Sequence, residues 1–369
     1  MKVLVCIPCL QNGGTEVQTL SLVEALVAAG HKPVVACYFE HEDGMVERFR
    51  QAGAYVILLS PGSNRPKGIK ATVKFLWKNF KQIIREVRPD VAHVQYMAPG
   101  AIPILILKLL GVSKIIVTTH TAADIYGRNG LRLIKFLTYT CINAFQCITL
   151  NAEKGYFGTS SIFNGTLKRH FTIYNALPSH ISIADKPKSI VNDTITVGVV
   201  SRLAEIKGMD LVIPAFEKAR EHDERLKLLI VGDGDLRQLM ESQAAESRFS
   251  SNIEFVGMKP QTELQEWYDK IDILLMPSRS EGFGLTALEG MARGCVPVVA
   301  NVGGLPEVVR FDTNLLHKPK EVNAIAERIF QLCYNPNRLG EYKLKSLQSA
   351  CLFSGVVYKN HIKQLYDKI

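Results

Sequence analysis

The segment 273–289 reads ILLMPSRSEGFGLTALE and decides the fold of the chain. Its four leading apolar residues predict a short buried strand, a polar loop with two glycines follows, and the last residues open a helix. In open α/β sheets, ligands bind beyond the carboxyl ends of such strands. The backbone amides of Gly282, Phe283 and Gly284 would point toward an anion there, since glycine permits close approach. The segment therefore predicts an anion-binding strand end.

Two carboxylates in this segment, Glu281 and Glu289, are separated by seven residues. Glu281 falls in the loop and Glu289 more than one turn along the helix, so the pair would grip hydroxyls at opposite ends of one ligand. Two sugars joined by a diphosphate fit that description. Taken singly, each has an ordinary interpretation: Glu281 favours a helix N-terminus, and Glu289 is a solvated helix residue.

A cationic motif lies upstream, where residues 199–208 read VVSRLAEIKG. The strand ends in a loop that carries Arg202 and Lys207, so both cations leave the same strand end. A diphosphate leaving group gains charge as its bond to a sugar breaks, and fixed cations stabilise that charge without a metal. The alternative is a surface loop with two solvated cations.

Outward from these motifs, apolar runs alternate with helix-period segments in both halves of the chain, as in parallel doubly wound sheets. With 369 residues, two domains are expected. We predict an N-terminal domain over 1–185, a second over 186–350 and a C-terminal helix over 351–369 that returns to the first domain. Strands are expected at 3–7, 33–38, 55–59, 91–95, 114–119, 195–201, 227–231, 253–256, 273–276 and 296–300, and helices at 16–29, 68–87, 209–221, 263–268, 285–293 and 356–368.

The composition is that of an ordinary globular protein, with 47% hydrophobic and 21% charged residues. The apolar start of the chain reads as a strand and not as a signal peptide, and the apolar run 101–110 is about half a membrane span. Eight cysteines without a regular framework indicate reduced thiols. The C-x-x-C of Cys6 and Cys9 falls inside the first strand pattern, which disfavours a redox pair. We therefore expect a cytoplasmic protein.

The formal charge of +9 is unevenly placed, because residues 1–200 carry 22 basic and 12 acidic side chains. Basic residues between Lys67 and Arg88 recur at three- and four-residue spacing beside apolar ones, which predicts a basic amphipathic helix. Two interpretations stay open: an ordinary domain helix with a solvated cationic face, or peripheral contact with an anionic membrane on the inner face. Nucleic acid is disfavoured, because no aromatic-basic platform accompanies the charge.

The stretch from Val197 to Arg310 resembles the E-x7-E family of retaining glycosyltransferases, and essentially the whole chain aligns in order. The N-terminal sequence Gly13-Gly14-Thr15-Glu16 resembles the family's opening loop, and residues 88–93, RPDVAH, resemble its next strand entry. The resemblance implies the GT-B architecture, in which two Rossmann-like domains of an α/β protein face each other across a cleft.

Position by position, the resemblance assigns roles to named residues. Arg202 and Lys207 would hold the diphosphate, Glu281 the hydroxyls of the donor sugar, and Glu289 the ribose. His120, at the end of a strand, resembles the histidine beside the transferred sugar, although a strand-end histidine alone is more often structural. The remaining donor-binding assignments are Gly13, Gly14, Gly257, Gly282, Phe283 and Gly284.

Three features depart from the family pattern. Residues 174–176 read YNA where Asn-Gly is usual, and the stretch after the second carboxylate motif is shortened around 311–319. Asp233-Gly234-Asp235 spells the D-x-D of metal-dependent transferases but lies in a strand-to-helix turn. We expect Asp235 to be the helix N-cap there, and we predict neither a metal nor another cofactor.

The expected reaction moves a hexosyl group from a nucleotide-diphosphate sugar to a glycan or lipid-linked acceptor with retained configuration, in bacterial cell-surface polysaccharide synthesis. Two alternatives remain. A sugar-nucleotide epimerase would need acid and base groups flanking the sugar, and a non-catalytic binding subunit should have lost the cations or carboxylates. A nicotinamide dehydrogenase is disfavoured, because no G-x-G-x-x-G follows the first strand.

Overall fold

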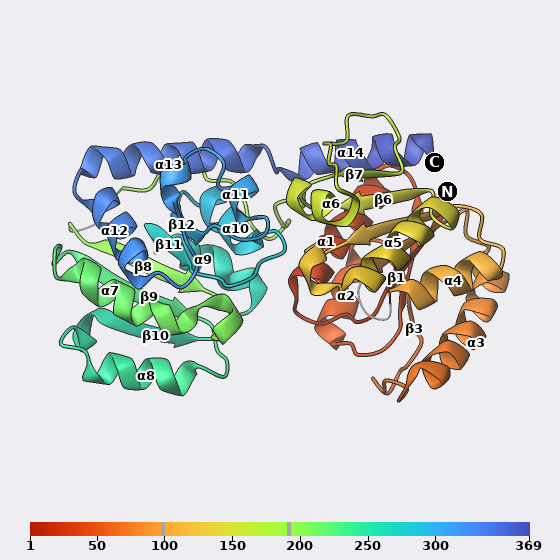
Figure 1. The fold of residues 1–369 in the computed structure, drawn as a ribbon, viewed down its shortest axis with the longest axis horizontal. Helices are drawn as coiled ribbons and strands as arrows, with labels where there is room; N and C mark the ends of the chain where they lie inside the picture. Colours follow the sequence, from red (N-terminus) through yellow and green to blue (C-terminus); the bar gives the residue numbers. More distant parts are fainter. Residues whose placement is uncertain (97–99, 190–192) are drawn as a thin grey trace. The chain divides into compact units, whose positions relative to one another are not determined.

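The computed structural model describes residues 1–96, 100–189 and 193–369 and divides them into two compact units (Figure 1). The N-terminal unit comprises Met1–Ala176 and Gly355–Ile369, and the C-terminal unit comprises Leu177–Ser354. The predicted boundaries at 185/186 and 350/351 lie nine and four residues, respectively, from the divisions between these units. No helix within these described ranges is long and apolar enough to cross a membrane.

The N-terminal unit is built on a seven-stranded sheet in the order β3-β2-β1-β4-β5-β6-β7. Its neighbouring strands pair in parallel, with Val3 aligned to Pro33 on one side and to Val91 on the other. The strand order reverses between β1 and β4, which is the topological switch point where such folds bind ligands. The strands are β1 (Lys2–Ile7), β2 (Lys32–Cys37), β3 (Tyr55–Leu58), β4 (Val91–Tyr96), β5 (Ile115–Thr119), β6 (Ala144–Cys147) and β7 (His170–Thr172).

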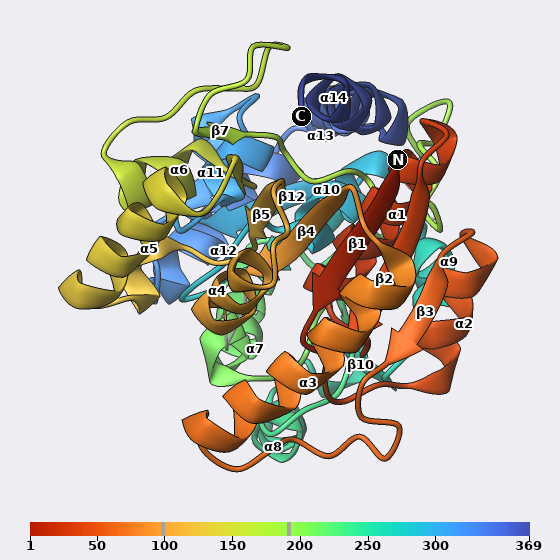
Figure 2. The ribbon, with the colours of Figure 1, turned by 90° about the vertical axis from the view of Figure 1, so that its right-hand side faces the viewer.

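Helices cover both faces of this sheet (Figure 2). One apolar core joins strand residues to α1, α2 and α14, and a second core on the opposite face joins them to α3, α4, α5 and α6. The return of the C-terminal helix buries Tyr358, Ile362, Leu365 and Tyr366 in the first core. The helices are α1 (Gly14–Ala28), α2 (Asp43–Gln51), α3 (Ile69–Val87), α4 (Ala101–Leu109), α5 (Arg128–Thr140), α6 (Leu150–Phe157) and α14 (Gly355–Lys368).

The C-terminal unit repeats the arrangement on a six-stranded sheet in the order β10-β9-β8-β11-β12-β13, with its switch point between β8 and β11. Helix α7 packs against α12, and α10 packs against α13. The strands are β8 (Ile195–Val200), β9 (Leu226–Val231), β10 (Ile253–Gly257), β11 (Ile273–Met276), β12 (Val296–Ala300) and β13 (Leu316–His317), and the helices are α7 (Val212–Arg220), α8 (Arg237–Glu246), α9 (Leu264–Tyr268), α10 (Leu285–Ala292), α11 (Leu305–Val308), α12 (Val322–Cys333) and α13 (Pro336–Cys351).

The predicted doubly wound α/β class is confirmed, and each predicted strand is present to within a residue or two. Helices such as α4, α5, α12 and α13 were not predicted, although the sequence carries a capping signal for α13, where Asn335 is the N-cap and Pro336 the first residue. Within α3, Leu76, Phe80 and Ile83 are buried, whereas two other apolar residues of the helix, Val73 and Trp77, are exposed.

Candidate functional site

The candidate site lies at the switch point of the C-terminal sheet, where the loops after β8 and β11 leave adjacent central strands. Arg202 follows the end of β8 by two residues and is exposed. Lys207 is the last residue of a 3-10 turn, Glu205–Lys207, in the same loop. Glu281 comes from the loop after β11. Three of the predicted side chains therefore leave the carboxyl edge of the sheet at one place.

An ion pair joins the two loops, because the Lys207 ammonium donates to Oε2 of Glu281 at 2.7 Å. The side chains keep 28% and 14% of their accessible surface, respectively, so the pair remains open to a ligand. The other oxygen of Glu281 accepts from the backbone N–H of Gly282 at 3.2 Å. The cation predicted for a diphosphate and the carboxylate predicted for a sugar thus stand side by side.

A second pair, which the sequence did not predict, fixes these loops to each other. The Arg279 guanidinium donates two parallel hydrogen bonds of 2.7 Å to the carboxylate of Asp210, and the Arg279 backbone N–H donates to the carbonyl of Ile206 at 2.9 Å. The hydrogen bonds from Arg279 lower the pKa of Asp210. A bidentate pair of this kind fixes geometry as well as adding energy. It holds the Lys207 loop against the Glu281 loop.

The loops approach closely because glycine occupies the contact points. A Cβ at Gly303, after β12, would collide with the carbonyl oxygen of Glu281, and one at Gly208 would collide with that of Pro277. Both glycines also have positive φ, a conformation that other residues adopt with strain. The sequence shows the two glycines at Val302-Gly303-Gly304, but only the fold shows that Gly303 lies against the backbone of Glu281.

Glu289 is buried in α10 with 7% of its surface exposed, which rules out the solvated-helix alternative. Its Oε2 accepts a 2.7 Å hydrogen bond from the hydroxyl of Tyr268, a fully buried residue at the end of α9. Burial raises the pKa of Glu289 to about 7, although the Tyr268 hydrogen bond opposes the rise. This carboxyl therefore changes charge near neutral pH.

The start of α10 differs in part from the expected anion cradle. Phe283 is buried, with its ring packed edge-on against Phe353 at 5.8 Å between centroids. Gly284 is the N-cap of α10 and has φ of 100°, and a Cβ there would collide with the Leu305 side chain. The Gly282 amide faces the Glu281 carboxylate, as above. These residues thus shape the loop around Glu281 in this structure.

The turn after β9 contains Asp233 and Asp235, and the expected N-cap was wrong. Helix α8 begins at Arg237 with Leu236 as its N-cap and without a side-chain cap. Asp233 accepts from the Gly234 N–H at 2.8 Å and pairs with Arg237 at 3.1 Å. Within the described residues, no group of three or more metal-ligating side chains gathers, at this turn or elsewhere.

Gly257 ends the edge strand β10 with positive φ and accepts a 2.9 Å hydrogen bond from the N–H of Gly232. Gly257 thus shares the carboxyl edge of the sheet with the Arg202 and Glu281 loops, although two strands separate it from the switch point.

The other predicted residues lie in the N-terminal unit. Gly13 is the N-cap of α1 and Gly14 its first residue. The buried Glu16 carboxylate folds back over Gly13 so closely that a Cβ there would collide with it. Cys9 donates to Glu16 at 3.1 Å. Burial raises the pKa of the Cys6 and Cys9 thiols to about 12, so neither is a thiolate at neutral pH.

His120 follows β5, and its Nε2 donates to Oε1 of Gln95 at the end of β4, at 2.7 Å. Burial lowers the pKa of His120 to about 4, so its ring is neutral at physiological pH. The buried His93 of β4 is hydrogen-bonded to Tyr366 and Thr118, and burial lowers its pKa to about 3. Gln95 was not predicted, and it fixes the tautomer in which Nδ1 of His120 is the acceptor.

Two parallel α/β units, one with cations and carboxylates at its switch point, define a doubly wound class of protein whose ligands bind at the carboxyl ends of the strands. Comparison with known proteins gives the family. Residues 182–346 match the model described as "Glycosyl transferases group 1", and residues 12–154 match "Glycosyltransferase Family 4". The chain belongs to this family of glycosyltransferases.

Named relatives act on lipids and surface polysaccharides. A GDP-mannose-dependent monoacylated alpha-(1-6)-phosphatidylinositol monomannoside mannosyltransferase of Corynebacterium glutamicum is 30% identical, with 70% of each chain covered. An O-antigen biosynthesis glycosyltransferase, WclY of Escherichia coli, is 29% identical over 58% of this chain and 62% of its own length. HepE of Anabaena in complex with UDP has the same fold, with a TM-score of 0.80 at 16% identity over the whole of both chains. The GT-B fold is therefore confirmed.

Proposed function

We propose that the protein transfers a hexosyl group from a nucleotide-diphosphate sugar to a glycan or lipid-linked acceptor, with retention of configuration, in cell-surface polysaccharide synthesis. The observation that supports this proposal is the Lys207–Glu281 ion pair at the switch point, because it sets a cation suited to a phosphate beside a carboxylate suited to sugar hydroxyls. The family membership supports the reaction class. HepE was crystallised with UDP and with UDP-glucose, which supports a nucleotide-sugar donor.

In the proposed complex, Arg202 and Lys207 hold the diphosphate while Glu281 accepts hydrogen bonds from the sugar and Glu289 from the ribose. In the structure, the Lys207 ammonium and the Glu281 carboxylate neutralise each other in an ion pair. Donor binding then exchanges one ion pair for two new sets of contacts, ammonium to phosphate and carboxylate to hydroxyl. Such pre-positioned charges stabilise the leaving diphosphate as the glycosidic bond breaks, without rearranging during the reaction.

The proposed chemistry needs no cofactor and no metal. The acceptor oxygen attacks the anomeric carbon on the face from which the diphosphate departs. The bond from that carbon to the phosphate oxygen breaks, the bond to the acceptor oxygen forms, and the acceptor proton passes to the departing phosphate. The neutral His120 is suited to hydrogen bonding with the sugar and not to donating a proton, since burial holds its pKa at about 4.

The acceptor side of the proposal rests on the N-terminal unit, whose sequence carries the excess of basic residues. A phosphorylated or lipid-linked acceptor and a peripheral position on the cytoplasmic face of a membrane suit that charge. The relatives that act on phosphatidylinositol mannosides and O-antigen support this acceptor class.

A panel of nucleotide sugars tests the function. The true donor should raise the melting temperature in a concentration-dependent way, since a ligand that binds the folded state stabilises it. Incubation of that donor with polyprenyl-diphosphate-linked and free glycans should then release the nucleoside diphosphate and give a product with the donor's anomeric configuration. Conversion of the donor sugar without an acceptor would establish the epimerase alternative. Stabilisation without any turnover would establish the binding subunit.

A further inference from the structure

Helix α3 of the N-terminal unit has an apolar side that its own unit leaves partly exposed. Its core side is buried through Leu76, Phe80 and Ile83. Next to this core side, three large apolar residues are exposed, Ile69 at 75%, Val73 at 37% and Trp77 at 39% of their surface. Residues four apart lie one above the other on a helix, so Ile69, Val73 and Trp77 form one exposed apolar row beside the core side.

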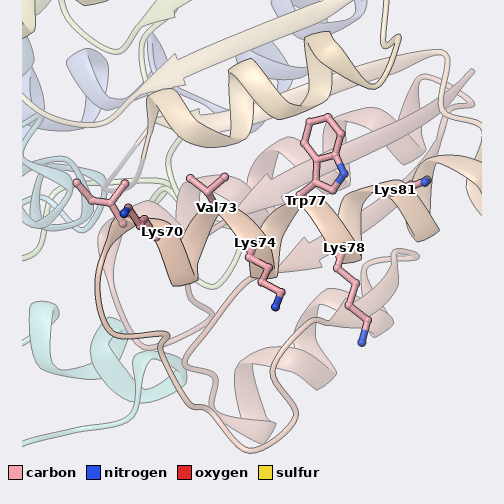
Figure 3. Close-up of a pocket in the computed structure, with 7 residues that line it drawn as sticks. Lys70, Val73, Lys74, Trp77, Lys78 and Lys81 are labelled. Carbon is pink, nitrogen blue, oxygen red and sulfur yellow. The ribbon is translucent and has the colours of Figure 1, made fainter.

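A row of lysines accompanies this apolar side. Lys70, Lys74, Lys78 and Lys81 line the same open groove along α3 as Val73 and Trp77, and in Figure 3 Lys74 and Lys78 project to the side opposite these two. From Arg48 to Arg85 the sequence contains no acidic residue. The lysines are therefore not neutralised within the helix.

The neighbouring helices extend the same character. α3, α4 and α5 contribute to one core and cover one face of the sheet (Figure 2), so their outer sides form one surface. The sequences of α4 and α5 contain four basic and no acidic residues. Five large apolar residues of these two helices are exposed, namely Leu105, Leu109, Leu133, Phe136 and Tyr139.

We propose that this cationic apolar face, the outer sides of α3, α4 and α5, docks on the surface of an anionic lipid bilayer. The apolar side chains would enter the headgroup and acyl boundary, while the long lysine stems extend along it and carry their charges to the phosphates. Binding to an anionic bilayer in particular needs both the apolar residues and the lysines of this face. Apolar residues alone would bind any lipid surface, and lysines alone would bind any polyanion.

Charge distinguishes this partner from a second copy of the chain. A two-fold pair of these faces would set the lysine rows of both copies against each other, which like charges disfavour. An anionic bilayer complements the lysines and at the same time accepts the aromatic side chains at its interface. The membrane binding itself does not depend on the transfer reaction. Its consequence, that the acceptor is lipid-linked and not a soluble glycan, rests on the proposed function.

Vesicle sedimentation tests the charge requirement. The wild-type protein should sediment with vesicles of phosphatidylglycerol and phosphatidylcholine and not with phosphatidylcholine alone. Each lysine near the surface should strengthen partitioning about fivefold, so reversal of Lys70, Lys74, Lys78 and Lys81 to Glu should weaken it by more than about a hundredfold. The matched control reverses four exposed lysines elsewhere, Lys218, Lys318, Lys359 and Lys368, and changes the net charge equally. The control should keep most of the binding.

Tryptophan fluorescence tests insertion, because the chain has two tryptophans, Trp77 and Trp267. Trp77 lies on the cationic apolar face, whereas Trp267 lies in the C-terminal unit between Lys259 and Lys270. Vesicles with brominated acyl chains should quench the single tryptophan of a Trp267→Phe variant and shift its emission to the blue. The Trp77→Phe variant, with Trp267 alone, should show neither effect.

A third comparison replaces exposed apolar residues. Leu109, Phe136 and Tyr139 changed together to Ser should weaken partitioning about tenfold or more, since each removes apolar area from the interface. The matched control changes the exposed Leu239, Tyr334 and Val356 to Ser. Circular dichroism and melting temperatures establish that all variants fold.

Several outcomes would overturn the proposal: equal binding to neutral and anionic vesicles, equal loss in the face variants and their controls, or no quenching of Trp77. Self-association in sedimentation velocity that the change of Leu109, Phe136 and Tyr139 to Ser abolishes, without vesicle binding, would assign the face to a second copy instead. Donor-induced stabilisation should be unchanged in the lysine variant. If no nucleotide sugar stabilises the wild-type protein, the proposed function is refuted, whereas the vesicle-binding result still stands.

Discussion

Replacement of Glu289 by Gln should make the protein more stable at alkaline pH while weakening its hold on the donor. Burial raises the pKa of this carboxyl from 4.5 to about 7. Between these pH values the folded protein therefore binds the proton more tightly than the unfolded chain does, and the free energy of unfolding falls as pH rises. The full penalty, about 3 kcal/mol, is reached above the folded pKa.

Glutamine cannot ionise, so the variant escapes this penalty. Its side-chain oxygen can still accept the hydrogen bond that the Tyr268 hydroxyl donates to Glu289. We expect the variant to exceed the wild type by about 3 kcal/mol at pH 8, a rise of roughly 6 to 12 °C in melting temperature for a unit of this size, and by less than about 1 kcal/mol at pH 5.

Thermal unfolding of both proteins from pH 5 to pH 8 measures the difference, with Glu224→Gln, at an exposed glutamate of the same unit, as the control. Titration with the nucleotide completes the test: wild-type affinity should rise with pH through about 7 as the carboxylate forms, and that of the Glu289 variant should be weaker and flat. A stability gain that is the same at pH 5 and pH 8, or a variant less stable than the wild type at pH 8, would refute the burial argument.

Three further outcomes are expected. Arg202→Ala and Lys207→Ala should each lower turnover by on the order of a hundredfold with the fold intact, because each removes a cation from the leaving diphosphate. Wild-type turnover in both variants would refute the role of these cations. Asp210→Asn, which breaks the bidentate pair with Arg279, should lower kcat/KM about tenfold while changing stability by less than about 1 kcal/mol, whereas Asp235→Asn should have no effect on either quantity. Transfer should survive a chelator, and loss that magnesium or manganese restores would show that a metal takes part.

The sequence by itself determined the architecture and the location of the site. Strand-length apolar runs that alternate with helix-period segments leave few arrangements other than parallel doubly wound sheets, and the carboxyl ends of central strands bind ligands in such sheets. Loops that follow β8 and β11 must then be neighbours at the switch point. For this reason, Arg202, Lys207 and Glu281 could be assigned to one site from their positions alone.

Tertiary structure decided which side chains touch and which faces stay open. Arg279 and Asp210 stand 69 positions apart, and Tyr268 and Glu289 stand 21 apart, so no local pattern reports either contact. The burial of Glu289, and with it a pKa of about 7, depends on what packs over α10.

The same limit applies to the apolar residues of α3. Its apolar residues form one broad arc around the helix, and periodicity cannot say how much of that arc the sheet will cover. Only the packed unit shows that Leu76 and Phe80 are buried while Val73 and Trp77, at the edge of the same arc, stay exposed. Local spacing fixes the direction of each side chain around a helix axis, but burial is fixed by partners from distant parts of the chain.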